Sequence, residues 1–170
     1  MNGREAIGAG ARERRVVRSV EPGDRPRWTQ LFEQYRSIEG APADDAVASR
    51  VWSWITGSGG PLEGVVVETD DDTGAGGLAG FCLYREFARP ASGTMGIYLD
   101  DLYVAVEHRG QGYARQMIHA VHDIAIHRRC SLVRWIVDPA NTTAYRLYER
   151  IADPKAWVTF EIDGGEAGRG

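Results

Sequence analysis

The sequence has little cysteine, no excess of basic residues and no long apolar run, and each lack excludes a class of protein. Two cysteines, Cys82 and Cys130, do not make a disulfide framework, which favours a reducing, cytoplasmic setting. The formal net charge of −4 disfavours nucleic acid and anionic membranes as partners, because both normally require a basic patch. No apolar run approaches the roughly 18 residues of a membrane span. We expect one domain at residues 14–163, with flexible tails at 1–13 and 164–170.

Common metal and nucleotide signatures are missing as well. His119 and His122 share a helical face but have no third ligand, so we expect no metal site. The acidic loop at 70–77 lacks the residue order of a calcium loop and is interpreted as a solvated hairpin turn. A Walker A loop must end in Gly-Lys-Ser/Thr, and the sequence contains no such tripeptide. A dinucleotide-binding fingerprint is excluded as well, because Arg115 stands where it requires its third glycine.

What is present is a strand that passes through a glycine turn directly into a helix, over residues 98–118. Small residues at 110, 112 and 114 let a ligand approach the backbone, and the first N–H groups of a helix have no acceptor inside the helix. With Arg109 beside it, such a helix end suits a phosphate or pyrophosphate. Taken alone, the glycines are equally compatible with an ordinary tight turn.

The remaining periodicity predicts the elements around this stretch. Helices are expected from about Trp28 to Ile38, from Asp44 to Gly57, after Gly112, and after Asn141. Because strand 131–137 follows the third helix, it should pair in parallel with strand 99–106 through a right-handed crossover. The predicted strands cover residues 15–20, 62–69, 78–87, 99–106, 131–137 and 156–162.

Three segments together resemble one family. Arg109-x-x-Gly112-x-Ala114 resembles the pyrophosphate signature Gln/Arg-x-x-Gly-x-Gly/Ala of the GCN5-related N-acetyltransferase (GNAT) superfamily. The preceding LDDLYVAVEHRG is similar to that superfamily's fourth strand, and NTTAYRLYER is similar to its coenzyme A-side helix. The resemblance covers residues 14–163. It implies an α/β fold with a mixed, mostly antiparallel sheet, a parallel strand pair splayed at the fourth strand, and about four flanking helices.

The resemblance also implies direct transfer of an acetyl group from acetyl-CoA to a primary amine, with no covalent intermediate and no metal. The D-L-Y-V strand and the L-Y-E-R-I-A helix end are similar to the histone/polyamine and D-amino-acid acetyltransferase subgroup. We therefore expect a small acceptor: a polyamine, a diamine or an amino acid. A peptide or protein lysine is the alternative acceptor. A non-catalytic acyl-CoA-binding regulatory module is the alternative from another class.

Coenzyme contacts follow from the same resemblance. The backbone N–H of Val104 is expected at the oxyanion that forms from the thioester, where pantetheine pairs with the strand. The residues assigned to the coenzyme are Val104, Val106, Arg109, Gly110, Gln111, Gly112, Tyr113, Ala114 and Asn141.

The reaction needs a base and an acid. Near pH 7 only about one primary amine in a thousand is neutral, so some group must take its proton. The resemblance to diamine acetyltransferases assigns this base to Asp100. Whether Asp100, Asp101 or a water molecule takes the proton is left open. Asp100 can instead cap a bulge or pair with an arginine. Period-two alternation turns Asp100 and Asp101 to opposite faces unless a bulge intervenes. The resemblance makes Tyr148 the acid for the thiolate, and assigns the acceptor to Asp100, Asp101, Tyr35 and Trp52.

The end of the chain departs from the family pattern. Relatives commonly carry a glycine after the coenzyme-side helix and often two further strands, whereas this chain has Ile151-Ala152-Asp153-Pro154 and room for one strand. That last strand, at 156–162, would be an edge that needs cover, so we expect a homodimer or a larger homo-oligomer.

Overall fold

Five strands form one mixed sheet in the order β1-β2-β3-β4-β5. The computed structural model describes residues 16–69, 77–156 and 158–162, and the chain divides into two compact units, residues 1–135 and 136–170. The described strands all lie in the first unit: β1 (Val17–Ser19), β2 (Glu63–Glu68), β3 (Leu78–Arg89), β4 (Thr94–Val104) and β5 (Val133–Arg134).

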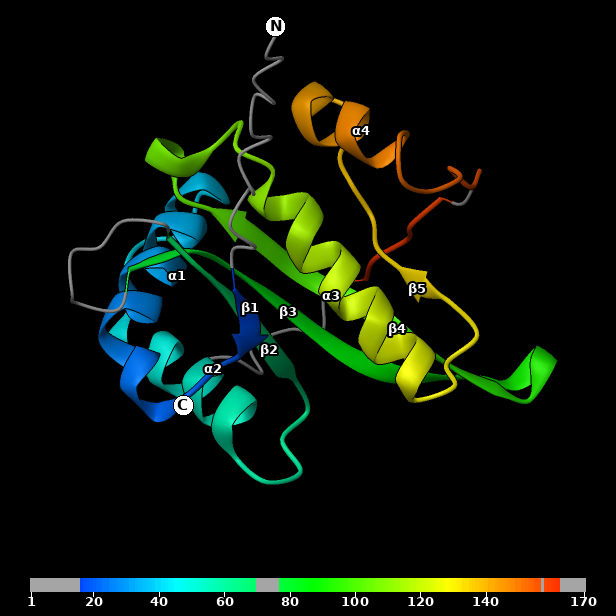
Figure 1. Cartoon of the computed structure of the whole chain (residues 1–170), viewed down its shortest axis with the longest axis horizontal. Helices are drawn as coiled ribbons and strands as arrows, with labels where there is room; N and C mark the ends of the chain where they lie inside the picture. The colour runs from blue at the N-terminus through cyan, green and yellow to red at the C-terminus, as the bar shows by residue number, and fades with distance from the viewer. Residues whose placement is uncertain (1–15, 70–76, 157, 163–170) are drawn as a thin grey trace, which may run out of the picture. The chain divides into compact units, whose positions relative to one another are not determined.

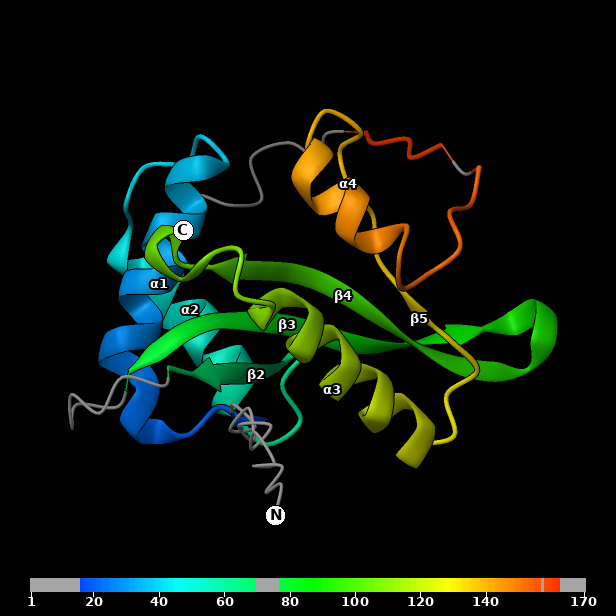
Figure 2. The same cartoon turned by 45° about the horizontal axis from the view of Figure 1, so that its top comes forward.

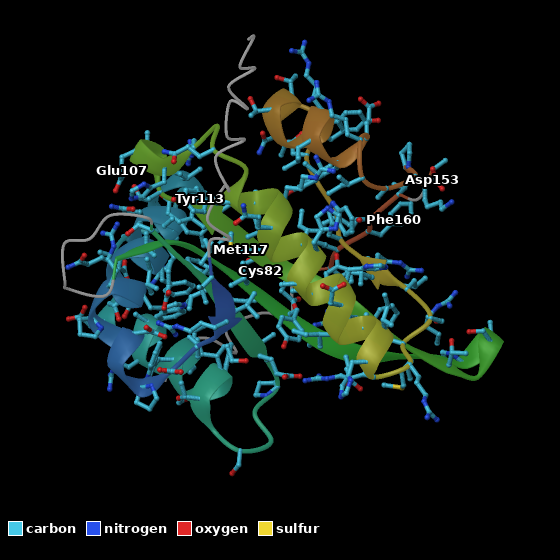
Figure 3. The ribbon with its side chains drawn as sticks, in the orientation of Figure 1. Cys82, Glu107, Tyr113, Met117, Asp153 and Phe160 are labelled. Atoms are coloured by element: carbon cyan, nitrogen blue, oxygen red, sulfur yellow. The ribbon has the colours of Figure 1, made fainter. Side chains whose placement is uncertain are left out.

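Helices cover both faces of this sheet (Figures 1 and 2). In the first unit they are α1 (Arg25–Ile38), α2 (Asp45–Thr56) and α3 (Tyr113–His127). α1 and α2 pack on one face, where Trp28 stacks on Phe32 with ring centroids 4.8 Å apart. α3 crosses the other face, and its Met117, labelled in Figure 3 with Cys82, is fully buried. Because both faces are covered, residues 78–84 of β3 are all buried.

Local signals set the boundaries of α2 as predicted, whereas α1 begins at Arg25, before the predicted start near Trp28. Asp44 caps α2 by accepting hydrogen bonds from the backbone N–H groups of Ala46 and Val47, and the helix ends before Gly57. Short 3₁₀ turns, η1 (Pro22–Asp24), η2 (Pro90–Ser92) and η3 (Val106–His108), connect the longer elements. None of the helices among the described residues is long and apolar enough to cross a membrane.

The parallel pair is confirmed but short. β5 pairs with β4 only at Ile97 and Tyr98, although the pattern predicts a strand over 131–137. Beyond Tyr98, β4 continues to Val104 with no strand of the described residues on that edge. The two strands therefore splay, as the family resemblance implies.

The predicted final strand is wrong. Residues 136–170 contain α4 (Thr142–Tyr148), which begins after the N-cap Asn141 as predicted, but residues 158–162 adopt no regular structure. Their alternating apolar side chains are exposed: Val158 to 75%, Phe160 (Figure 3) to 90% and Ile162 to 97%. Alternation alone does not make a strand, because an extended segment also needs a partner for its backbone hydrogen bonds. The two expected tails and most of the acidic loop, residues 70–76, lie outside the described residues.

Candidate active site

The turn before α3 has the backbone that a bound phosphate requires. Gly110 and Gly112 have φ values of +75° and +89°, in the left-handed region that favours glycine. A Cβ built on either would meet no atom within 4 Å, so the space over this backbone is open. The first hydrogen bond of the helix runs from the N–H of Gln116 to the carbonyl of Gly112. The helix start, with Arg109 next to it, therefore fits an anionic phosphate group.

Arg109 also connects this turn to the edge of β4 that pairs with no described strand beyond Tyr98. Its Nε donates to the carbonyl oxygen of Val104 at 3.1 Å, and its guanidinium lies 5.8 Å from the ring centroid of Tyr103. The N–H of Ala105 donates to Ala79 of β3, so the main-chain groups of the preceding Val104 face away from β3. This is the edge along which the sequence predicts the pantetheine arm and the oxyanion contact.

A β-bulge lies at the two adjacent aspartates of β4. Leu83 pairs with Asp101 and Tyr84 pairs with Leu99, which leaves Asp100 as the extra residue. The bulge breaks the period-two alternation, so the two acids do not face opposite sides. Both turn toward the face that carries α1.

The first acid, Asp100, is held by an arginine. Arg85 of β3 donates from Nε to Asp100 Oδ1 at 3.1 Å, and its guanidinium lies 5.0 Å from the ring centroid of Tyr98. Sequence reasoning left both a bulge and an arginine pairing open for Asp100, and both occur. It did not identify Arg85, because the pairing depends on strand register and no local pattern marks it.

The second acid, Asp101, is held by α1. The Tyr35 hydroxyl donates to Asp101 Oδ1 at 2.6 Å, across 66 positions of sequence. Burial, with the negative charges of Asp100 and Glu39, raises the pKa of Asp101 above its ordinary value, while the hydrogen bond from Tyr35 acts in the opposite direction. Burial and the bond to Asp101 raise the pKa of Tyr35 well above its usual range. Tyr35 therefore stays protonated and donates at any ordinary pH.

Comparison with known proteins identifies the family of this chain. The Acetyltransferase (GNAT) family matches residues 26–152. The chain belongs to this family. Its activity is therefore that of an acetyltransferase acting on an amine, and the family resemblance drawn from the sequence is confirmed.

Individual relatives agree with the family. The chain is 26% identical over 152 residues to "D-amino-acid N-acetyltransferase HPA3" of Saccharomyces cerevisiae, covering 89% of this chain and 92% of that protein. It is 32% identical over 92 residues to "Thialysine N-epsilon-acetyltransferase" of Sus scrofa, covering 51% of this chain and 54% of that protein. The fold is similar to the crystal structure of ribosomal-protein-alanine N-acetyltransferase from Brucella melitensis, with a TM-score of 0.72, 23% identity, and 88% of this chain and 99% of that chain covered.

A groove runs along α1 of this GNAT chain beside the end of β4. It has a volume of about 570 Å³ and two acidic side chains, Glu33 and Glu107, the second labelled in Figure 3. Tyr103 at its base donates from its hydroxyl to Gln34 Oε1 at 3.2 Å. The lining residues are Gln30, Glu33, Gln34, Ser37, Ile38, Tyr103, Val106 and Glu107. Both acids are paired with arginines, Glu33 with Arg36 at 3.8 Å and Glu107 with Arg27 at 3.4 Å, and the rest of the lining is neutral.

The other predicted site residues have varied surroundings. Trp52 is packed in the core against Trp28, with ring centroids 5.2 Å apart, and is 8% exposed. Tyr113 is buried at the start of α3, whereas Val106, Gln111 and Gly112 are exposed.

In the second unit, Asn141 caps α4 by accepting from the N–H of Ala144 at 3.2 Å. Tyr148 is the last residue of that helix and is half-buried. Their predicted roles toward the coenzyme stay predictions.

A covalent route finds no support in the cysteines. Cys82 is fully buried, and burial together with the nearby charges of Asp101 and Asp100 raises the pKa of its thiol well above the ordinary value. Cys130, in the turn after α3, also has a raised pKa, with burial as the main cause. Neither cysteine has the lowered pKa of a nucleophilic thiol.

Proposed function

We propose that this GNAT chain transfers the acetyl group of acetyl-CoA directly to the primary amine of a small cationic molecule: a polyamine, a diamine or an amino acid. One observation carries the proposal: the β4 bulge that turns Asp100 and Asp101 toward the same face, beside α1. Two adjacent carboxylates attract an ammonium group and offer a base for its proton.

The coenzyme half of the proposal rests on the turn before α3. Acetyl-CoA supplies the activated acetyl group. Its pyrophosphate would bind the helix start at residues 109–114, and the backbones of Val104 and Val106 would contact the pantetheine arm and the thioester oxygen. The open space over Gly110 and Gly112, and the edge of β4 on which no described strand pairs beyond Tyr98, support this assignment.

Proton transfers complete the reaction. A β4 carboxylate takes a proton from the ammonium group, the neutral amine attacks the thioester carbon, and the C–S bond breaks as the amide forms. Tyr148 gives a proton to the leaving thiolate, because the pKa of a phenol, near 10, is close to that of a thiol. Asn141, the N-cap residue of α4, is the second residue of this segment that contacts the coenzyme. Both roles rest on the sequence pattern of residues 141–150.

The activities for which the relatives are named support a small acceptor. The yeast relative is described as acting on D-amino acids and the porcine relative on thialysine, so both names point to amines of amino-acid size. A peptide or protein lysine is the other acceptor class to be tested.

The test is thiol release from acetyl-CoA near pH 8 with polyamines, diamines, lysine, D- and L-amino acids and a basic peptide. Release with one class of small amine supports the proposal and identifies the acceptor. Release with the peptide alone would make it a peptide acetyltransferase. Tight acetyl-CoA binding with no release from any amine would contradict catalysis and favour the binding module.

A homo-oligomer and a cytoplasmic setting stay predictions. Light scattering tests the first: a mass equal to one chain would contradict it.

A further inference from the structure

Asp100 and Asp101 are chemically different although they are neighbours on the same face. Asp100 is exposed and pairs with Arg85, so protonating it would break a charge-assisted hydrogen bond. Asp101 is half-buried and makes no ion pair within the described part of the chain; its partner is the neutral Tyr35 hydroxyl. Of the two, Asp101 is the carboxylate that can take a proton without losing a cation.

The groups around Asp101 favour the same assignment. Tyr35 of α1, Glu39 just after that helix and Asp100 of β4 act on the Asp101 carboxyl, Cys82 of β3 lies near enough for Asp101 to raise the pKa of its thiol, and Arg85 of β3 pairs with Asp100. The two formal charges that act on Asp101, those of Asp100 and Glu39, are negative, and Arg85 is engaged by Asp100. A negative and partly dry surrounding makes a carboxylate a stronger base.

Tyr35 fixes the carboxylate without competing for the proton. Its hydroxyl donates to Oδ1, so the second oxygen, Oδ2, is the one available to accept from an ammonium group. A phenol with its pKa well above the usual range does not act as the base itself. It orients the group that does.

We propose that Asp101 is the base of the acetyl transfer and that Tyr35 is its positioning residue, with Asp100 as a neighbouring charge that attracts the amine. The inference rests on the proposed function. Asp101 accepts the first proton of R–NH₃⁺, the C–N bond forms as the C–S bond breaks, and the thiolate is protonated by Tyr148. The second nitrogen proton restores Tyr148 through solvent, and Asp101 releases one proton to water, so the overall reaction liberates one H⁺.

The experiment is the pH dependence of kcat/KM for thiol release, measured from pH 5 to 9.5 with an accepted amine. Asp101→Asn should lower kcat/KM about 10²- to 10³-fold, with acetyl-CoA affinity retained. It should also remove the acidic limb of the pH profile, which is the fall of kcat/KM as Asp101 becomes protonated. Asp100→Asn is the matched control. It should cost less than about tenfold and move the acidic limb to lower pH, because the charge of Asp100 raises the pKa of Asp101.

Tyr35→Phe gives a shift of opposite sign. The tyrosine hydrogen bond lowers the pKa of Asp101, so its removal should move the acidic limb upward by about half to one pH unit. A purely structural role for Tyr35 would lower activity without moving the limb. This variant and Asp100→Asn decide the matter even where Asp101→Asn does not fold.

The outcomes separate the inference from the function. An active wild type whose acidic limb disappears in Asp100→Asn would make Asp100 the base and overturn the inference. An acidic limb that stays at the wild-type pH in both Asp100→Asn and Tyr35→Phe would also overturn the inference. A wild type that releases thiol with no amine would contradict the proposed function itself.

Discussion

The two halves of the proposed site are built in different ways. The coenzyme end, residues 104–114, is continuous in sequence, and its main features are backbone ones: two left-handed glycines, a helix start and a free strand edge. The acceptor side, made of Tyr35, Arg85, Asp100 and Asp101, is assembled from one helix and two strands by side-chain contacts.

This difference decides how each half tolerates substitution. A backbone site is sensitive to residues that change conformation and insensitive to side-chain identity at neighbouring positions. A side-chain site depends on charge and hydrogen bonding, so substitutions of similar size can change its chemistry while the fold is kept. Substitutions that separate conformation from charge therefore test the comparison.

The largest effect after those at Asp101 is expected at the leaving group. Tyr148→Phe should lower kcat about 10²- to 10³-fold, because the thiolate loses its proton donor. The affinity for acetyl-CoA should be unchanged, since only one hydroxyl is removed. Steady-state kinetics and calorimetric titration of acetyl-CoA measure the two quantities.

Tyr145→Phe is the matched control, because Tyr145 lies on the same helix, α4. It removes the same hydroxyl from a position to which no role is assigned, so kcat should stay near the wild-type value. A wild-type kcat in Tyr148→Phe as well as in Tyr145→Phe would show that Tyr148 is not the proton donor.

A smaller effect is expected from backbone strain at the coenzyme end. Gly112→Ala forces a Cβ into a left-handed conformation at a cost of about 1–2 kcal/mol of stability. It also puts a methyl group where a phosphate would approach, so acetyl-CoA should bind about tenfold more weakly. Calorimetry gives the affinity and thermal unfolding gives the stability.

Gly59→Ala separates these two consequences. Gly59 has φ +76° in the turn before β2, and its Cβ would likewise meet no atom within 4 Å. The stability loss should match that of Gly112→Ala, but acetyl-CoA binding should be unaffected. If both variants bind acetyl-CoA equally well, the glycine turn is only a tight turn and the phosphate assignment fails.

The same difference explains what the sequence could predict. The start of α3 and the Asp44 cap of α2 depend on residues within a few positions, so local patterns located them. The Asp100–Arg85 pair and the Tyr35–Asp101 bond depend on a one-residue bulge and on contacts up to 66 positions apart. No local pattern identifies the extra residue of a bulge, and one extra residue changes the face of each side chain that follows.

The failed prediction at 156–162 has a related cause. Val158, Phe160 and Ile162 alternate as in a half-buried strand, but alternation says nothing about whether a neighbouring edge is available. The short β5 shows the same limit, since its apolar run is longer than the two residues that pair with β4. Pairing is a property of the assembled sheet.

The smallest effect, and the one that bears most directly on the acceptor, is expected at Arg85. Arg85→Ala leaves Asp100 without its cation, so a polyamine or diamine should bind the two carboxylates better and its KM should fall about two- to fivefold. High salt should reduce the difference, because the groups are partly exposed. Arg89→Ala is the control, because Arg89 lies farther along β3 and donates to Ser131 Oγ; it should leave KM unchanged.

The sign of the Arg85→Ala effect also separates the acceptor classes. An amino acid carries a carboxylate beside its amine, and Arg85 is the cation paired with Asp100, so the KM for such an acceptor should rise. A polyamine has no group for Arg85 to bind and gains from its removal. Unchanged KM values for both classes would mean that Arg85 and Asp100 do not face the acceptor. Selectivity between acceptors would then depend on Asp101 and the groove alone, and only one of the two aspartates at the bulge would contact the acceptor.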